Sequence, residues 1–177
     1  MNPADVSVLI FSTNVGVART LRMALRGMGA RSIQLAADET QLFEGFAAID
    51  TSAVLVYVDG PENDAGVDMI RFLRTSERSP NIRMPIVAAS PRRDLATVNA
   101  VINAGGNEYV LFPASGDALL KKITAARFST RPFIEQPDYV GPCRRRREDK
   151  GYTGPERRAD RIAANENAKT DPESAAS

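Results

Sequence analysis

Short apolar runs alternate with amphipathic segments along the first 128 residues of the chain. The clearest run, Ala53–Asp59 (AVLVYVD), is continuous in apolar residues, ends on a carboxylate and is followed by Gly60 and Pro61. A run of this length that is bounded by turn residues is typical of a strand buried on both faces of a parallel sheet. Asp59 would then stand at the carboxyl end of the strand, where open α/β sheets place ligands and chemistry.

Four further apolar runs and five helical patterns complete the alternation. Strands are predicted at 6–11, 32–36, 53–59, 85–90 and 108–112, and helices at 15–28, 38–49, 67–78, 92–104 and 116–128. In the fourth helix, helical spacing predicts that the buried face consists of Leu95, Val98, Val101 and Ile102. Strict alternation at this spacing predicts right-handed crossovers and helices on both faces of the sheet. The predicted fold class is α/β, with a doubly wound five-stranded parallel sheet.

The composition changes after Ser129, where proline, glycine and charged residues dominate and apolar periodicity disappears. We therefore predict a domain over residues 1–129 and an Arg-rich tail over 130–177 that is largely disordered or folds on binding. Within the tail, the segment Tyr139-Val-Gly-Pro-Cys-Arg-Arg145 is echoed by Tyr152-Thr-Gly-Pro-Glu-Arg-Arg158. Such a repeat is rare in a random linker and indicates a specific role, although a solvated linker remains an alternative.

Composition removes several classes of function. The 23 basic and 22 acidic residues nearly cancel, so charge can matter only locally, and the absence of His excludes imidazole bases and a phosphohistidine donor. The single cysteine, Cys143, cannot form an internal disulfide, and its thiol is either activated by neighbouring arginines or incidental. No apolar run approaches the roughly 18 residues of a membrane span. We expect a soluble, cytoplasmic protein.

Two motifs carry a resemblance to a known family. The segments Pro85–Ser90 (PIVAAS) and Ala104–Pro113 (AGGNEYVLFP), together with the alternation, resemble the receiver domain of bacterial response regulators over about residues 5 to 128. The resemblance implies the flavodoxin-like (CheY-like) fold and signal transduction of the two-component, phosphorelay class. It also implies that Ser90 is the switch hydroxyl and Tyr109 the switch aromatic. Asp59 is the possible phospho-acceptor, although counting back from an expected Asp-Gly motif puts its neighbour Val58 at that register.

The resemblance breaks at the chemical centre. An active receiver has two acidic residues after the first strand and a lysine after the fifth, whereas this sequence has Ser12, Thr13 and Phe112 there. Mg²⁺ needs carboxylate oxygens, so we do not expect Asp59 to hold it nearly alone. A phosphoryl group would also lose a contacting cation, at about 4 kcal/mol for a close charge pair. The resemblance thus implies a degenerate, non-enzymatic receiver with no catalytic or metal-binding residues.

Two other interpretations of these residues stay open. The first is a phospho-accepting response regulator that is modified at Asp59. The second is purely structural: Asp59 would be a polar strand end, Ser90 a strand cap and Tyr109 a half-buried aromatic.

The tail suggests a nucleotide ligand. Acidic residues are interleaved with its arginines, which weakens a patch made only for nucleic acid phosphates. Guanine suits such a mixture, because Arg can bond to O6 and N7, a carboxylate can accept from N1 and N2, and Arg or Tyr can stack on the ring. A degenerate CheY-like domain with an Arg-rich extension resembles the CheY-like cyclic di-GMP effectors that act at flagellar motors of alphaproteobacteria.

This second resemblance assigns roles in the tail by residue type. Arginines would contact guanine and phosphate, aspartates would bond to the guanine edge, and tyrosines would stack; the residues are Arg144, Arg145, Arg146, Arg147, Arg157 and Arg158, Asp149 and Asp160, and Tyr139 and Tyr152. The ligand would be a cyclic dinucleotide, and a partner signalling or motor protein would dock on Ser90, Tyr109 and the fourth helix. A tail that binds nucleic acid is the weaker alternative, and the sequence leaves the oligomeric state open.

Overall fold

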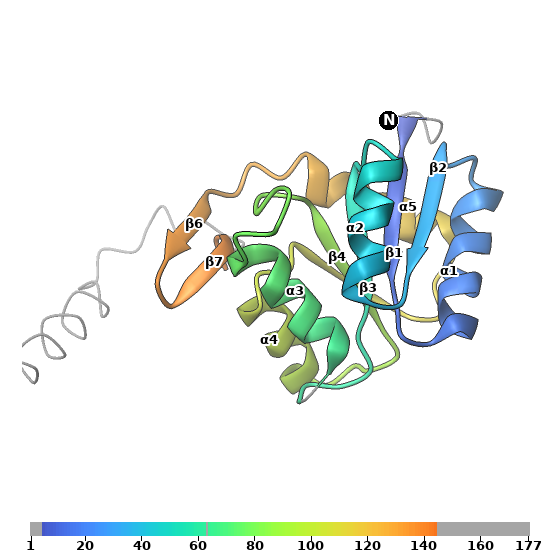
Figure 1. The fold of residues 1–177 in the computed structure, drawn as a ribbon. Helices are drawn as coiled ribbons and strands as arrows, with labels where there is room; N and C mark the ends of the chain where they lie inside the picture. The colour runs from blue at the N-terminus through green and yellow to red at the C-terminus, as the bar shows by residue number, and fades with distance from the viewer. Residues whose placement is uncertain (1–4, 63, 145–177) are drawn as a thin grey trace, which may run out of the picture. The chain divides into compact units, whose positions relative to one another are not determined.

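The computed structural model describes residues 5–62 and 64–144. A five-stranded parallel sheet in the order β2-β1-β3-β4-β5 forms its centre, with helices on both sides (Figure 1). The strands are β1 (Ser7–Phe11), β2 (Ser32–Ala36), β3 (Ala53–Tyr57), β4 (Ile86–Ser90) and β5 (Glu108–Leu111), and the helices are α1 (Val15–Gly27), α2 (Glu39–Ala48), α3 (Ala65–Thr75), α4 (Leu95–Asn103) and α5 (Gly116–Arg127). The predicted fold class and all ten predicted elements are confirmed, with ends that differ by a few residues.

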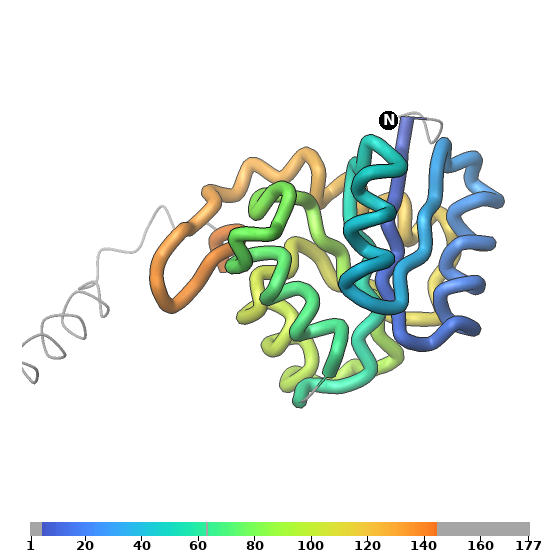
Figure 2. Tube along the Cα trace, viewed as in Figure 1, coloured from blue at the N-terminus to red at the C-terminus, as the bar shows by residue number. Residues whose placement is uncertain are grey.

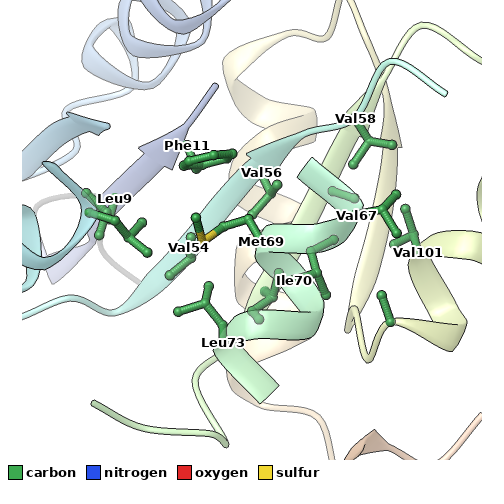
Figure 3. Close-up of a cluster of buried hydrophobic side chains, with 14 of the residues drawn as sticks. Leu9, Phe11, Val54, Val56, Val58, Val67, Met69, Ile70, Leu73 and Val101 are labelled. Carbon is green, nitrogen blue, oxygen red and sulfur yellow. The ribbon is translucent and has the colours of Figure 1, made fainter. Parts of the chain in front are cut away.

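Apolar side chains fill both faces of the sheet. Val54 and Val56 point to the face that α2, α3 and α4 cover (Figure 3), whereas Ala53 and Leu55 point to the face of α1 and α5. All four side chains are fully buried. Because both faces are covered, the strands are continuous apolar runs rather than alternating ones. Each fully buried aliphatic side chain contributes about 1.5 to 3 kcal/mol, so this core fixes the loops at the strand ends.

Each of the five helices begins at a polar N-cap. The capping side chains accept backbone N–H groups from the first turn of their helices, and they are Asn14, Asp38, Asp64, Asp94 and Ser115. Such a cap contributes about 1 kcal/mol. The caps therefore fix where the helices start relative to the carboxyl ends of the strands. No helix in the described part of the chain is long and apolar enough to cross a membrane.

An antiparallel hairpin follows α5, where a disordered tail was predicted. Its strands are β6 (Phe133–Gln136) and β7 (Tyr139–Pro142), and the chain can be followed from α5 to this hairpin in Figure 2. The compact unit that contains the sheet extends to Arg144. The predicted boundary at residue 129 is therefore wrong, and residues 130–144 belong to the folded unit. Residues 145–177 lie outside the described part of the chain.

A buried arginine explains why the hairpin is ordered. The side chain of Arg74, in α3, is 1% exposed, and its guanidinium lies 5.5 Å from the ring centroid of Phe133 in β6. It donates four hydrogen bonds, to Gly105 O (2.9 Å), Ile82 O (2.5 Å), Met84 O (2.7 Å) and Asn107 Oδ1 (2.7 Å). Burial lowers the pKa of Arg74 to about 10, so the group stays charged at neutral pH. The ring of Phe133 thus packs against a guanidinium whose N–H groups are already hydrogen-bonded.

Two further contacts attach the hairpin. A Cβ atom on Gly141 would lie 2.7 Å from the Cα atom of Gly105, so the two backbones approach more closely than any side chain would allow. Arg131, just before β6, donates to Asn107 O at 2.6 Å and lies 3.5 Å from a carboxylate oxygen of Glu108. These contacts join residues 23 to 36 positions apart, which a local sequence pattern does not reveal.

Candidate functional site

A cavity of about 640 Å³ opens at the carboxyl ends of β1 and β3. Thr13, Tyr57 and Asp59 are among its lining residues, together with the first turns of α1 and α3. This is the edge of the sheet at which the sequence predicted a site. We call the group of Ser12, Thr13, Tyr57, Asp59 and Phe112 the carboxyl edge.

An aromatic pair occupies the middle of the carboxyl edge. The rings of Tyr57 and Phe112 pack edge to face, with centroids 5.8 Å apart and planes at 79°. Burial and, to a lesser extent, the carboxylate of Asp59 raise the pKa of Tyr57, so its hydroxyl stays protonated at neutral pH. Phe112 stands where the resemblance expects a lysine, and its ring partner is Tyr57. Sequence reasoning missed Tyr57 because it looks like one more apolar residue of the strand.

Asp59 lies in the loop after β3 and is exposed. Its Oδ1 accepts a long hydrogen bond of 3.4 Å from the Tyr57 hydroxyl, and its carbonyl oxygen accepts one of 3.2 Å from Nε of Arg92. Val58, the other candidate at this register, is fully buried, and its N–H donates to Ala89 O at 2.9 Å. Val58 therefore extends the strand into the core, and Asp59 is the first side chain beyond it.

Asp64 organises this loop, and sequence reasoning did not assign it that role. Oδ2 of Asp64 accepts the N–H groups of Asp59 (2.7 Å) and Gly60 (3.0 Å), and Oδ1 accepts those of Gly66 (2.8 Å) and Val67 (3.1 Å). An Asp directly before a helical pattern is an N-cap signal that could have found it. Because four backbone donors already use both carboxylate oxygens, Asp64 is committed to structure.

The Ser12 hydroxyl of the carboxyl edge also bonds to the backbone. Ser12 is 2% exposed, and its Oγ donates to Asn14 O (3.0 Å) and accepts the Asn14 N–H (3.1 Å). In the described residues, no three His, Cys, Asp or Glu side chains gather around one possible metal position. Mg²⁺ prefers several carboxylate oxygens. With Asp64 committed to the loop, the residues of this edge do not fit that cation.

The two switch-like residues come together at the end of β4. Ser90 is fully buried, and its Oγ accepts the N–H of Arg92 at 3.2 Å. The hydroxyl of Tyr109 donates to Arg92 O at 2.8 Å. Burial raises the pKa of Tyr109, and a hydrogen bond with Ser90 opposes the rise. The structure therefore brings both side chains to one loop, whereas their role as switches stays a prediction.

The predicted buried face of α4 is wrong at its first residue. Leu95 is 71% exposed, whereas Thr97 and Val101 are buried. The Thr97 hydroxyl donates to the N-cap residue Asp94 at 2.9 Å, which lets a polar side chain lie inside. Leu111 on the neighbouring edge strand β5 is also 40% exposed. The surface near Ser90 and Tyr109 is thus more apolar than the sequence pattern suggested.

Solved structures with a similar fold include response-regulator receivers. The chemotaxis response regulator CheY4 of Vibrio cholerae has a TM-score of 0.54 at 15% identity, over 68% of this chain and 98% of its own. A response regulator of Thermotoga maritima has a TM-score of 0.55 at 20% identity, over 70% of this chain and 98% of its own. The fold is the CheY-like receiver fold.

A further receiver-fold structure belongs to a larger signalling enzyme. The signal receiver domain of a modulated diguanylate cyclase from Desulfovibrio desulfuricans G20 has a TM-score of 0.54 at 20% identity, over 68% of this chain and 92% of that chain. No family model matches the sequence, and no curated protein matches it significantly. At these identities the comparisons establish the receiver fold alone.

Beyond the receiver fold, the hairpin places the first repeated unit of the tail. The guanidinium of Arg144 lies over the ring of Tyr139, 4.0 Å from its centroid, and the Tyr139 hydroxyl donates to Pro142 O at 2.6 Å. The backbone N–H of Cys143 donates to Pro132 O at 2.7 Å. The structure therefore brings two predicted ligand residues together. The other eight lie outside the described residues: Arg145, Arg146, Arg147, Asp149, Tyr152, Arg157, Arg158 and Asp160.

Proposed function

We propose that this protein is a non-enzymatic CheY-like signalling protein that does not depend on phosphorylation. Its receiver-fold domain would dock on a partner signalling or motor protein, and its Arg-rich carboxyl-terminal segment would bind cyclic di-GMP. The observation that carries the proposal is the contact between Tyr57 and Phe112. Two aromatic rings lie where phosphoryl chemistry would need a lysine, and Asp59, whose Oδ1 accepts a 3.4 Å hydrogen bond from Tyr57, lies in an exposed loop.

The polar groups around these rings support the same proposal. Asp64 is saturated by four backbone N–H groups, and Ser12 closes a turn. A phosphoryl group adds nearly two negative charges, which here would face neither a lysine nor a magnesium site. The carboxyl edge therefore serves the fold, and a ligand is better sought where arginines gather.

Isothermal titration calorimetry tests the ligand. Cyclic di-GMP should bind the full chain with a Kd in the micromolar range, which corresponds to about 8 kcal/mol. A chain that ends at Arg144 keeps the whole compact unit but loses the second Tyr-Gly-Pro-Arg-Arg unit, so it should bind at least about ten-fold more weakly. If the full chain releases no heat and shifts no NMR signal with the dinucleotide, the ligand assignment is wrong.

The alternative, phosphorylation at Asp59, has its own test. Beryllofluoride with Mg²⁺ mimics a phosphoryl group on an aspartate, and we expect it to leave the NMR signals of Ser90 and Tyr109 unchanged. Saturable shifts that disappear in Asp59→Ala would favour a phospho-accepting response regulator. Nucleic acid binding would instead show as equal affinity for unrelated oligonucleotides, with a steep dependence on salt.

A further inference from the structure

The strand β2 lies at one edge of the sheet (Figure 1). Among residues 5–62 and 64–144, β1 is the only strand that pairs with it. The sequence of β2, Ser-Ile-Gln-Leu-Ala, contains neither a charged residue nor proline. Proteins commonly place such residues on exposed edge strands, where they prevent another strand from pairing. The outer side of β2 therefore lacks this protection.

The outer side of β2 presents the backbone groups of Ile33 and Leu35. The carbonyl oxygen of Ala36 accepts the Ser12 N–H at 2.9 Å, so the backbone groups of residue 36 point toward β1. Because N–H and C=O groups alternate in direction along a strand, those of Ile33 and Leu35 point away from β1. These groups form a short template for one more strand.

A row of arginines runs along α1, the helix beside this edge. Arg19, Arg22 and Arg26 occupy positions i, i+3 and i+7 of the helix, which lie on one side of it. Helix α1 contains no acidic residue, and no carboxylate among the described residues forms an ion pair with any of the three. Like charges at this spacing destabilise a helix. The row therefore costs stability that no described ion pair offsets.

The arginine row lies on the flank of α1 that is nearer the open edge. Helix α1 packs on β1 and β2, whereas α5 covers β3, β4 and β5 on the same face. Ala24 lies on the flank toward α5, because a Cβ atom on Gly116 would be 2.3 Å from its carbonyl oxygen. At about 100° per residue, Arg22 lies about 160° around the helix from Ala24. Arg22 therefore lies on the flank toward β2, where Ile33 and Leu35 join the core of this face.

The other face of the edge carries no such row. It is flanked by α2, whose residues 39–48 include neither Lys nor Arg. Gln41 of this helix also limits the template, because its Oε1 accepts the N–H of Ala37 at 3.1 Å. A strand that pairs with β2 therefore meets the arginine row on one of its faces only.

The arginine row decides which strand fits the edge. In an antiparallel pair of two β2 strands related by a two-fold axis, both α1 helices would lie on the same face of the joined sheet. Their arginine rows would then face each other, which opposes pairing with a second copy of this chain. Carboxylates on a partner strand would instead compensate the row.

We propose that the edge of β2, flanked by Arg19, Arg22 and Arg26, binds an extended acidic segment of a partner protein as an added strand. The backbone of the segment pairs with Ile33 and Leu35, and every second side chain is a carboxylate on the face of α1. The inference goes beyond the proposed cyclic di-GMP function and does not depend on it.

NMR on the full chain tests the inference with a synthetic peptide of alternating Glu and Val, about ten residues long. At saturation, exchange of the Ile33 and Leu35 amide protons with solvent should slow at least about ten-fold, because pairing removes them from water. A peptide with Lys in place of every Glu should bind at least about ten-fold more weakly. Versions N-methylated at every Glu or at every Val each lose the donors of one edge, so at least one of them should lose binding.

Substitutions in α1 test the charge separately from the backbone. Arg22→Gln should weaken binding of the Glu-Val peptide about three-fold, and Gln at all three positions of the row about ten-fold or more. Arg71→Gln, which removes an exposed arginine from α3, is the matched control and should change nothing. The triple variant should be at least as stable as the native chain in urea, because it removes like-charge neighbours.

The remaining outcomes would overturn the proposal. The first is a Glu-Val peptide that does not bind, or that binds without protecting Ile33 and Leu35. The second is a Lys-Val peptide that binds equally well. If these protons are already protected in the full chain but exposed in a chain that ends at Arg144, the occupant is a segment of the chain itself. Protection that rises with protein concentration would show that a second copy is the occupant.

Discussion

The carboxyl edge and the hairpin use polar side chains in opposite ways. At the carboxyl edge and its loop, three polar side chains bond within the protein: Ser12 to a turn, Tyr57 to Asp59 and the neighbouring Asp64 to four N–H groups. At the hairpin, one arginine, Arg74, is buried and satisfied, and a second, Arg144, is stacked and exposed. Polar groups that are mutually satisfied build a scaffold. Arg144, by contrast, forms no ion pair with a carboxylate among residues 5–62 and 64–144.

The two arginines are connected through the contacts of the hairpin. The guanidinium of Arg74 packs against the ring of Phe133 and donates to the Gly105 carbonyl. Gly105 in turn packs against Gly141 in β7. The hairpin that contains Tyr139 is therefore attached to the receiver-fold domain next to the buried guanidinium of Arg74. Substitutions at Arg74 should therefore disorder the pair of Tyr139 and Arg144, whereas substitutions at the carboxyl edge should not.

The largest effect is expected from Arg74→Met. The change leaves three carbonyl oxygens without this donor, and Asn107 Oδ1 keeps only the bond from the Ile86 N–H. It should cost about 3 to 5 kcal/mol in the free energy of unfolding. Arg71→Met, on the same helix, removes an exposed ion pair with Asp68 and should cost under about 0.5 kcal/mol. Urea denaturation measures both, and equal losses would contradict the role of Arg74.

Phe112→Ala tests the scaffold at the carboxyl edge. Loss of the half-buried ring and of its contact with Tyr57 should cost about 2 to 3 kcal/mol, below the range for a fully buried phenylalanine. Phe128→Ala, at a ring that is 64% exposed, should cost under about 0.5 kcal/mol. The affinity for cyclic di-GMP should stay native in Phe112→Ala. A matching loss of affinity would show that the two regions are not independent.

Gly141→Ala should separate the hairpin from the domain. Its Cβ atom would lie 2.7 Å from the Cα atom of Gly105, so the hairpin must move, at a cost of about 1 to 3 kcal/mol. Gly27→Ala, at the end of α1, meets nothing within 4 Å and should leave the protein equally or slightly more stable. NMR signals of the Tyr139 ring report the displacement directly. An unchanged Tyr139 environment would rule out this close packing.

The smallest effect concerns alkaline pH. Burial raises the pKa of Tyr139 above 10.0, so the folded protein keeps a phenolic proton that the unfolded chain releases. The resulting stabilisation is complete below about pH 10 and is lost as the pH rises through the folded value. Tyr139→Phe has no such proton, so its urea midpoint should fall less steeply than that of the native chain between about pH 9.5 and 11. Parallel slopes would show that Tyr139 is not buried in solution.

The receiver-type elements could be predicted because their signals are local. An apolar run such as Ala53–Tyr57 is recognisable wherever a strand is buried on both faces, and capping residues such as Asp38 mark helix starts. The prediction for Leu95 was wrong because spacing alone does not say how far a helix end reaches over the sheet. Asp94 accepts hydrogen bonds from the N–H and the hydroxyl of Thr97, so Thr97 is the buried residue of this turn instead.

The candidate sites were less predictable, since their key contacts join distant positions. The short runs on either side of Pro137 and Asp138 carry a hairpin signal, but strands of four residues are stable only with outside support. That support comes from Arg74, which looks like a solvent-facing arginine in the pattern of α3. Tyr57 likewise looks like an ordinary strand residue until its ring meets Phe112.

By itself, the sequence determined the alternation of strands and helices and the presence of Ser12, Thr13 and Phe112 at the ends of the strands. Both follow from residue type at a given position, and short-range hydrophobic and capping interactions decide them. Only the tertiary structure decided that the folded unit continues to Arg144, that Tyr57 fills the carboxyl edge, and that Tyr139 holds Arg144. These depend on contacts that form only after the chain has folded back on itself, around a buried guanidinium whose hydrogen-bond acceptors lie up to 33 residues away.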